Sequence, residues 1–247
     1  MAGEEAIHLL FYQECLILAT LKIMVPRLGS PLARNLPLRD GDQVLGLGAG
    51  TGLIGILAAR LAQWVVAKEV VPAFSESARA NAFLNGVADR VEVRTGDIFA
   101  SVGGETFDVI STNPPRMPTP PDREWDDAQS RADDGGPDGR AVLDRNIHET
   151  PLHLKLQGRR LFALFGILAV ERALETLRVA GLGPRGLARE ERLLPRIAQE
   201  RLEHFRSLDA EKVLSAGRPA TCRATSSAGR KASRCPPFSS STRMTSI

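Results

Sequence analysis

The chain has 247 residues, of which 43% are apolar and 25% charged, and this globular composition excludes a small disulfide-stapled protein. Its net charge of +3 comes from the end of the chain, because seven Lys or Arg residues and no acidic residue follow Glu211, whereas residues 1–211 carry 25 basic and 29 acidic residues. The positive charge therefore gives no reason to class the folded part as a nucleic-acid binder. The three cysteines form no CxxC pair, so neither a metal site nor a disulfide framework is indicated.

Residues 1–39 are expected to form a helical lead-in. Residues 4–25 are densely apolar without strand-like alternation and are followed by Pro26, which favours a helix packed on a larger body. Glu4 and Glu5 stand where a secretory signal would be positively charged, and the longest apolar run is too short to cross a bilayer. We therefore expect a cytoplasmic protein without a membrane segment.

Residues 40–211 show a regular alternation of short apolar runs and helical stretches. Strands are expected at residues 44–47, 64–70, 91–94, 107–112, 160–165 and 187–193, and helices at 53–62, from Pro72 to before Gly86, and at 141–149, 168–180 and 196–208. This alternation predicts an α/β domain with a doubly wound, mostly parallel, Rossmann-like sheet covered on both faces. Residues 212–247 are rich in Ser and Arg and lack an apolar run long enough for a strand, so we expect a disordered basic tail.

A cluster of glycines follows the first of these strands. Gly48, Gly50 and Gly52 alternate at the turn between that strand and the next helix, where the backbone can closely approach a nucleotide cofactor. A phosphate-binding P-loop is excluded because no Gly-Lys-Ser/Thr follows. Residues 50–55 also fit the dinucleotide fingerprint GxGxxG, and glycines used only for tight packing of strand against helix remain an alternative.

Two carboxylates follow the next two strands. Glu69 closes the strand at 64–70, where it can accept hydrogen bonds from both hydroxyls of a ribose. Asp97 follows the strand at 91–94 and can bond an adenine amino group at the same sheet edge. The alternatives are a solvated strand-end carboxylate for Glu69 and an ordinary turn residue for Asp97.

The strand at 107–112 ends abruptly at Asn113-Pro114-Pro115, because neither proline can donate to a strand ladder. Between residues 116 and 140 prolines and glycines are frequent, which indicates a long irregular loop. Loops of this length in compact domains are usually lids, binding segments or disordered.

The order of glycine turn, Glu69, Asp97 and Asn113-Pro114-Pro115 resembles the class I S-adenosylmethionine-dependent methyltransferases. The Asn-Pro-Pro sequence looks like that of their amino-methylating branch, which includes release-factor glutamine methyltransferases and small-domain methyltransferases. Residues 135–139, Gly-Gly-Pro-Asp-Gly, are similar to a motif of the glutamine-methylating enzymes. The resemblance implies that S-adenosylmethionine is bound by Gly48, Gly50, Gly52, Glu69 and Asp97.

The same resemblance implies a catalytic role for Asn113 and Pro114. The side-chain oxygen of Asn113 and the carbonyl of Pro114 would accept hydrogen bonds from an NH₂ group and aim its nitrogen at the methyl group, so that catalysis comes from alignment and electrostatics. The acceptor would be an amide or exocyclic amine nitrogen of a protein or nucleic acid, and a small metabolite stays open as well.

Three departures from the family pattern favour alternatives to an active methyltransferase. Gly46 stands where the family usually has an acidic residue, which predicts cofactor binding weaker by roughly tenfold to over a hundredfold. Arg116 stands where the branch commonly has an aromatic residue, and no candidate for the family's final antiparallel strand is evident. The alternatives to an active enzyme are therefore a catalytically inactive binding module and, from the GxGxxG match, a nicotinamide-dependent oxidoreductase.

Overall fold

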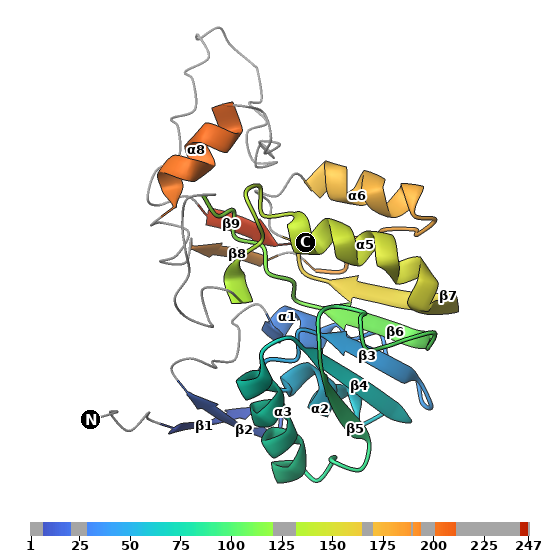
Figure 1. Ribbon diagram of the computed structural model, residues 1–247. Helices are drawn as coiled ribbons and strands as arrows, with labels where there is room; N and C mark the ends of the chain where they lie inside the picture. Colours follow the sequence, from blue (N-terminus) through green and yellow to red (C-terminus); the bar gives the residue numbers. More distant parts are fainter. Residues whose placement is uncertain are drawn as a thin grey trace, which may run out of the picture.

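The structure is a computed structural model that describes residues 7–20, 29–120, 132–164, 170–188, 190–193, 201–210 and 243–246. Its centre is a five-stranded parallel sheet in the order β5-β4-β3-β6-β7 (Figure 1). These strands are β3 (Gln43–Leu47), β4 (Trp64–Glu69), β5 (Val91–Thr95), β6 (Phe107–Thr112) and β7 (Leu154–Phe162). The other described elements are β1 (Ile7–Tyr12), β2 (Cys15–Thr20), α1 (Gly29–Arg34), α2 (Leu53–Ala58), α3 (Pro72–Leu84), α5 (Ala141–His153), α6 (Val170–Val179), β8 (Glu190–Leu193), α8 (Leu202–Ala210) and β9 (Arg243–Ser246).

The strand order confirms the predicted doubly wound sheet. The chain lays down β3, β4 and β5 in one direction, then crosses back to place β6 and β7 on the other side of β3. The direction of winding thus reverses between β3 and β6, and open α/β sheets bind ligands in the crevice at such a switch point.

The central strands are buried on both faces, as expected for a parallel sheet covered by helices. Val44, Val65 and Val109 pack with residues of α2, α3 and the β1–β2 hairpin. Their neighbours Leu45 and Val66 face the opposite side and pack against residues that follow β5. Because side chains alternate between the faces of a strand, this pattern produces the nearly continuous apolar runs seen in the sequence.

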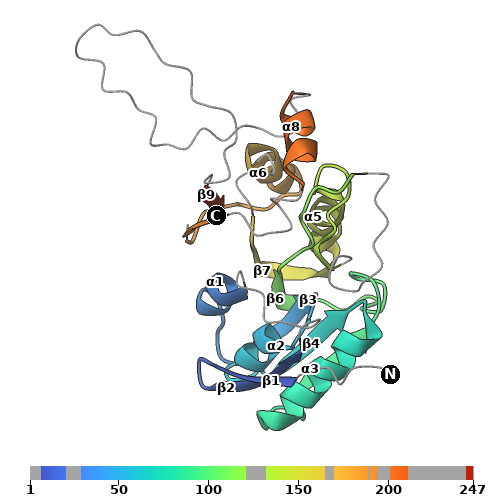
Figure 2. The same cartoon turned by 90° about the vertical axis from the view of Figure 1, so that its left-hand side faces the viewer.

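The helix predicted for residues 4–25 is wrong where the structure describes them. Residues 7–20 form an antiparallel hairpin, with β1 and β2 joined by a two-residue turn at Gln13 and Glu14, both at positive φ. The hairpin lies against α2 and α3 (Figures 1 and 2). In β2 the alternate residues Cys15, Ile17 and Ala19 are fully buried, but the apolar residues between them conceal this period of two.

Two asparagines, Asn81 of α3 and Asn85 directly after that helix, explain why this segment is a strand. Asn85 Oδ1 accepts from the Leu16 N–H at 2.9 Å and its amide donates to the Leu16 carbonyl at 2.8 Å. Asn81, one helical turn earlier, makes the same pair of bonds with Leu18, at 2.8 and 3.0 Å. The two side chains thus act as a strand partner for the edge of β2, and this tertiary contact overrides the local preference for helix.

The predicted sixth strand forms, but outside the main sheet. β8 pairs antiparallel with β9 in a separate two-stranded sheet, so residues 243–246 of the predicted disordered tail are paired. β9 has only four residues, and so short a strand depends on pairing with its partner. Its sequence therefore contains no apolar run that would predict a strand. The rest of the tail, residues 212–242 and 247, lies outside the described residues. Among the residues that the structure describes, no helix is long and apolar enough to cross a bilayer.

Candidate active site

The sheet register brings the predicted site segments to one edge. Leu47 at the end of β3 pairs with Lys68 of β4 and with Thr112 of β6, and Glu69 at the end of β4 pairs with Thr95 of β5. The residues that follow these strand ends are therefore neighbours at the carboxyl edge of the sheet. Along this edge lie, in order, the segment with Asp97, then Glu69, the glycine turn and the Asn-Pro-Pro segment.

The glycine turn bends back over the end of β4. Gly48, Gly50 and Gly52 all have positive φ, at 74°, 54° and 83°, a conformation that costs other residues about 1–2 kcal/mol. The N–H groups of Gly48 and Ala49 both donate to the Lys68 carbonyl, at 2.9 and 2.8 Å. These bonds fix the turn to the neighbouring strand and confirm that the glycines serve a tight backbone path.

We expect Gly52→Ala to destabilise the protein by about 2–5 kcal/mol, against about 1–2 kcal/mol for Gly41→Ala. Both glycines have positive φ, but a Cβ at Gly52 would lie 3.1 Å from the Ala78 Cα in α3, whereas nothing lies within 4 Å of one at Gly41. Urea denaturation of the two variants measures the difference. Equal losses would show that α2 and α3 do not pack as closely as described here.

Glu69 is buried, with 6% of its surface exposed, and its carboxylate is held by two backbone donors. Oε2 accepts from the Gly50 N–H at 2.8 Å, and Oε1 accepts from the Val71 N–H at 3.0 Å. The carboxylate therefore bridges the glycine turn and the start of α3. Each carboxylate oxygen can accept a second hydrogen bond, so Glu69 retains the capacity to bind a ligand hydroxyl.

Asp97 is half-exposed and forms an ion pair with Arg145 of α5, which also donates to Glu149 Oε1 at 2.8 Å. These bonds raise the pKa of Arg145. This partner could not be predicted from the sequence, because Arg145 is 48 residues away on a different element. The exposed pair adds little to stability, but it fixes the direction of the Asp97 carboxylate at the sheet edge.

Lys68 is a second residue at this edge that sequence reasoning missed. Its side chain is fully buried at the end of β4, where it donates to Ser101 Oγ. A Cβ at Gly96 would lie only 2.8 Å from Lys68 Nζ, so the glycine before Asp97 leaves the room that this lysine needs. Burial lowers the pKa of Lys68, the positive charge of Arg94 lowers it further, and Asp97 opposes the shift.

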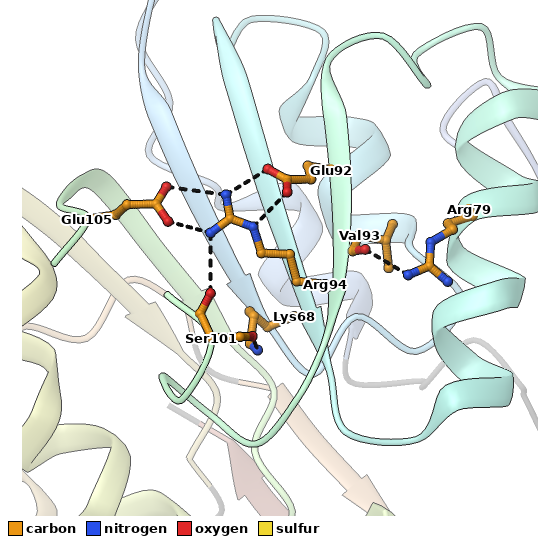
Figure 3. A network of polar contacts seen from close by, with 7 residues as sticks. All are labelled: Lys68, Arg79, Glu92, Val93, Arg94, Ser101 and Glu105. Atoms are coloured by element: carbon orange, nitrogen blue, oxygen red, sulfur yellow. Dashed lines mark hydrogen bonds and ion pairs between the residues drawn. The ribbon is translucent and has the colours of Figure 1, made fainter. Parts of the chain in front are cut away.

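Arg94 holds the segment after β5 in place (Figure 3). It donates to both carboxylate oxygens of Glu92, at 2.8 and 2.7 Å, and to Glu105, and its Nη1 lies 3.4 Å from the Ser101 carbonyl. These hydrogen bonds raise the pKa of Arg94 and lower that of Glu92. Through Ser101 and Glu105, Arg94 thereby ties the segment that follows β5, which includes Asp97, to that strand.

We expect Arg94→Met to lower the free energy of unfolding by about 1–2 kcal/mol at neutral pH, after allowing for the partial exposure of both glutamates. The lowered pKa of Glu92 contributes stability that is present above the ordinary carboxyl pKa and is lost as the pH falls below it. The gap between wild type and variant should therefore narrow between neutral pH and about pH 3. Urea midpoints at the two pH values measure it.

Arg79→Met is the matched control, since Arg79 donates to the Val93 carbonyl of β5, the strand that also carries Arg94 (Figure 3). Its effect should be smaller and independent of pH in this range. A pH-independent gap for Arg94→Met would contradict the role of Glu92.

Asn113 and Pro114 lie directly after β6, as predicted, and one donor already engages both of their oxygens. Arg116 Nη1 donates to Asn113 Oδ1 and also to the Pro114 carbonyl, at 3.3 Å. The Arg116 side chain is buried, with 7% exposed, and burial lowers its pKa to about 10 while the charge of Asp133 opposes the shift. The two oxygens therefore converge on one nitrogen position.

The Gly-Gly-Pro-Asp-Gly motif packs against this segment. The Met117 N–H donates to the Asp133 carbonyl at 2.8 Å, and the Gly135 N–H donates to the Met117 carbonyl at 3.0 Å. A Cβ at Gly135 would lie 2.7 Å from the Gly139 Cα and 2.8 Å from the Arg116 Cα, so the close approach requires glycine. The returning part of the long loop thus fixes the backbone beside Asn-Pro-Pro.

Arg201, just before α8, supports the same segment from the other end of the chain. It is 2% exposed and donates to Thr119 Oγ1 at 2.9 Å, with the Met117 and Pro118 carbonyls at 3.4 and 3.3 Å. The sequence indicated only a packing helix here, because the contact spans more than 80 residues. Of the long loop, residues 121–131 lie outside the described part of the chain.

Part of this chain is similar in sequence to known methyltransferases. A Methanocaldococcus jannaschii protein named for N5-glutamine methylation of proteins is 41% identical over 128 residues, which are 51% of this chain and 64% of that protein. A tRNA1(Val) (adenine(37)-N6)-methyltransferase of Porphyromonas gingivalis is 38% identical over 94 residues, 35% of each chain. The chain therefore spans less than two thirds of the length of either relative.

A solved structure and a family model agree with the fold described above. The crystal structure of Trm5b from Pyrococcus abyssi matches with a TM-score of 0.56 at 17% identity, over 79% of this chain and 54% of that one, which shows a shared fold. Residues 29–119 match the model of the methyltransferase small domain, and this match contains β3 to β6, the glycine turn and Asn-Pro-Pro. Together with the sheet order and the edge geometry, this match shows that residues 29–119 of this chain are similar to the methyltransferase small domain.

Proposed function

We propose that this protein is an S-adenosylmethionine-dependent methyltransferase that methylates an amide or exocyclic amine nitrogen of a protein or nucleic acid. The observation that carries the proposal is the convergence of Asn113 Oδ1 and the Pro114 carbonyl on one nitrogen, that of Arg116. Two acceptors aimed at one NH₂ position, at the switch point of the sheet, suit a substrate amine.

The chemistry of such a substrate explains the need for two acceptors. The lone pair of an amide or aryl amine nitrogen is delocalised, so the nitrogen is a weak nucleophile unless its orientation is controlled. Asn113 and Pro114 would each accept one N–H and fix the NH₂ group, while the prolines keep the backbone rigid. The contribution of these groups is alignment and electrostatic preorganisation.

The residues at the other end of the edge fit an adenosine-bearing cofactor. A Cβ built at Gly48 or Gly50 meets no atom of the described residues within 4 Å, so these residues leave the surface above the turn open, and Glu69 can accept ribose hydroxyls there. Asp97 would bond the adenine amino group, and Gly52 keeps the turn close to α3. S-adenosylmethionine, when bound, supplies an electrophilic methyl group on a sulfonium sulfur.

Among possible acceptors we favour a glutamine side chain of a protein. The relative named for glutamine methylation matches more of this chain, at higher identity, than the one named for tRNA adenine methylation. The Gly135 to Gly139 motif, which resembles that of glutamine-methylating enzymes, packs on the Asn-Pro-Pro segment. We also propose a cytoplasmic location, as predicted from the sequence.

The test is transfer of labelled methyl from S-adenosylmethionine into a fractionated cell extract. We expect label in the protein fraction, and acid hydrolysis of N5-methylglutamine should release it as methylamine, which is volatile once the hydrolysate is made alkaline. Label in the RNA fraction, retained on the base, would instead support the nucleic-acid acceptor. Absence of label from every fraction, with S-adenosylmethionine bound, would leave the inactive binding module, and preferential binding of a nicotinamide dinucleotide would leave the oxidoreductase.

A further inference from the structure

Arg116 occupies the position that the proposed substrate amine needs. Its Nη1 is within hydrogen-bonding reach of both acceptor oxygens, Asn113 Oδ1 and the Pro114 carbonyl. A guanidinium NH₂ and an amide NH₂ are both planar nitrogens with two N–H donors. The side chain of this chain's own arginine thus resembles the group that would be methylated.

The two nitrogens cannot share the position. Hydrogen-bonded N and O atoms lie about 2.9 Å apart, so a second nitrogen that approached both oxygens from the side that Nη1 occupies would overlap with it. The guanidinium is also buried and remains a cation at neutral pH, and a charged donor binds a neutral oxygen more strongly than an amide N–H does. An incoming amide therefore competes with Arg116 at a disadvantage.

The backbone beside Arg116 is fixed, so the side chain is the part that can leave. The N–H groups of Arg116 and Met117 both donate to the Asp133 carbonyl, at 3.2 and 2.8 Å, and the Thr119 N–H donates to the Gly136 carbonyl at 2.9 Å. Rotation of the arginine side chain requires none of these bonds to break. Asp133, whose charge acts on the Arg116 guanidinium and whose carbonyl accepts from the Arg116 N–H, favours side-chain positions that keep this attraction.

We propose that Arg116 is a specificity-determining residue that occupies the amine position of the acceptor site, so that an acceptor amide binds only by displacing the guanidinium. This inference rests on the proposed function, because it takes Asn113 Oδ1 and the Pro114 carbonyl as the amine acceptors. Its consequence is that acceptors with additional contacts, which offset the cost of displacement, are selected over an isolated glutamine side chain.

The test is the affinity of N-acetylglutamine N-methylamide, a minimal neutral glutamine, measured by NMR titration with S-adenosylhomocysteine present. Arg116→Met removes the donor and retains a long side chain, and it should lower the dissociation constant about tenfold or more. Arg116→Lys retains the charge without the planar donor, so its affinity should lie between those of Arg116→Met and wild type. Arg160→Met, which removes another arginine, partly buried and hydrogen-bonded to Asn146 of α5, is the matched control and should bind as wild type does.

In wild type the side-chain Nε–H signal of Arg116 should also shift as the amide binds. Equal affinity of wild type and Arg116→Met, in proteins with intact thermal unfolding, would overturn the inference, as would failure of all four proteins to bind the amide. Failure of the proposed function is distinguishable, because tighter amide binding by Arg116→Met without methyl transfer by any of the proteins would refute the activity alone.

Discussion

Asn113→Ala is expected to reduce methyl transfer by about 10²–10³-fold, the usual effect of removing one preorganised hydrogen-bonding group from an active site. The alanine lacks Oδ1, which accepts a hydrogen bond from Arg116 Nη1 in the present structure. In the proposed reaction the same oxygen accepts a hydrogen bond from the substrate NH₂ group. The Pro114 carbonyl alone would hold the amine less firmly and in more than one orientation. Binding of S-adenosylhomocysteine should stay within about twofold of wild type, because Asn113 is not among the proposed cofactor ligands.

The two quantities are measured separately, transfer by labelled methyl and cofactor binding by calorimetry. Asn35→Ala is a matched control. Asn35, directly after α1, is also partly buried, but its side chain donates to the Pro31 carbonyl within that helix. It should keep its activity. Full activity of Asn113→Ala would show that the residue does not orient the acceptor, and loss of cofactor binding would place it at the wrong end of the site.

Glu69→Gln is expected to weaken binding of S-adenosylhomocysteine by about tenfold to a hundredfold, because a charged acceptor of ribose hydroxyls becomes a neutral one. The carboxylate now accepts from the Gly50 and Val71 N–H groups, and a Gln amide oxygen can keep only part of this pairing. Some loss of stability should therefore accompany the loss of affinity.

Calorimetric titration gives the affinity, and a thermal unfolding curve shows that the variant is folded at the temperature of the titration. Glu76→Gln, at an exposed position of α3, is the control with the same change of charge. Unchanged affinity of Glu69→Gln would show that Glu69 does not bind the ribose. Its hydrogen bonds would then serve only to hold the glycine turn in place.

The central sheet was predictable because its local signals agree. The apolar runs of β3, β4, β5 and β6 are bounded by turns, Pro72 starts α3, and Gly86 at positive φ follows its end. The same rules that align parallel strands then place Gly48, Glu69, Asp97 and Asn113 at one edge. Residue type and spacing were therefore enough to predict that these residues lie at the same edge of the sheet.

The remaining contacts depend on side-chain paths and on distant partners. The β1–β2 hairpin is decided by Asn81 of α3 and by Asn85 directly after it, both more than 60 residues away. The sequence also gave no sign that β7 begins at Leu154, because its pairing with β6 is interrupted by a register shift. Arg116 stood out in the sequence as a departure from a family pattern, but its bonds to Asn113 and Pro114 emerge only in three dimensions.

The most direct measurement is a crystal structure of the protein with S-adenosylhomocysteine. We expect the ribose hydroxyls on Glu69, the adenine beside Asp97, and the sulfur above the glycine turn on the side facing Asn113 Oδ1. The ligand at another surface, or at this edge with its sulfur directed away from Asn113, would contradict the account.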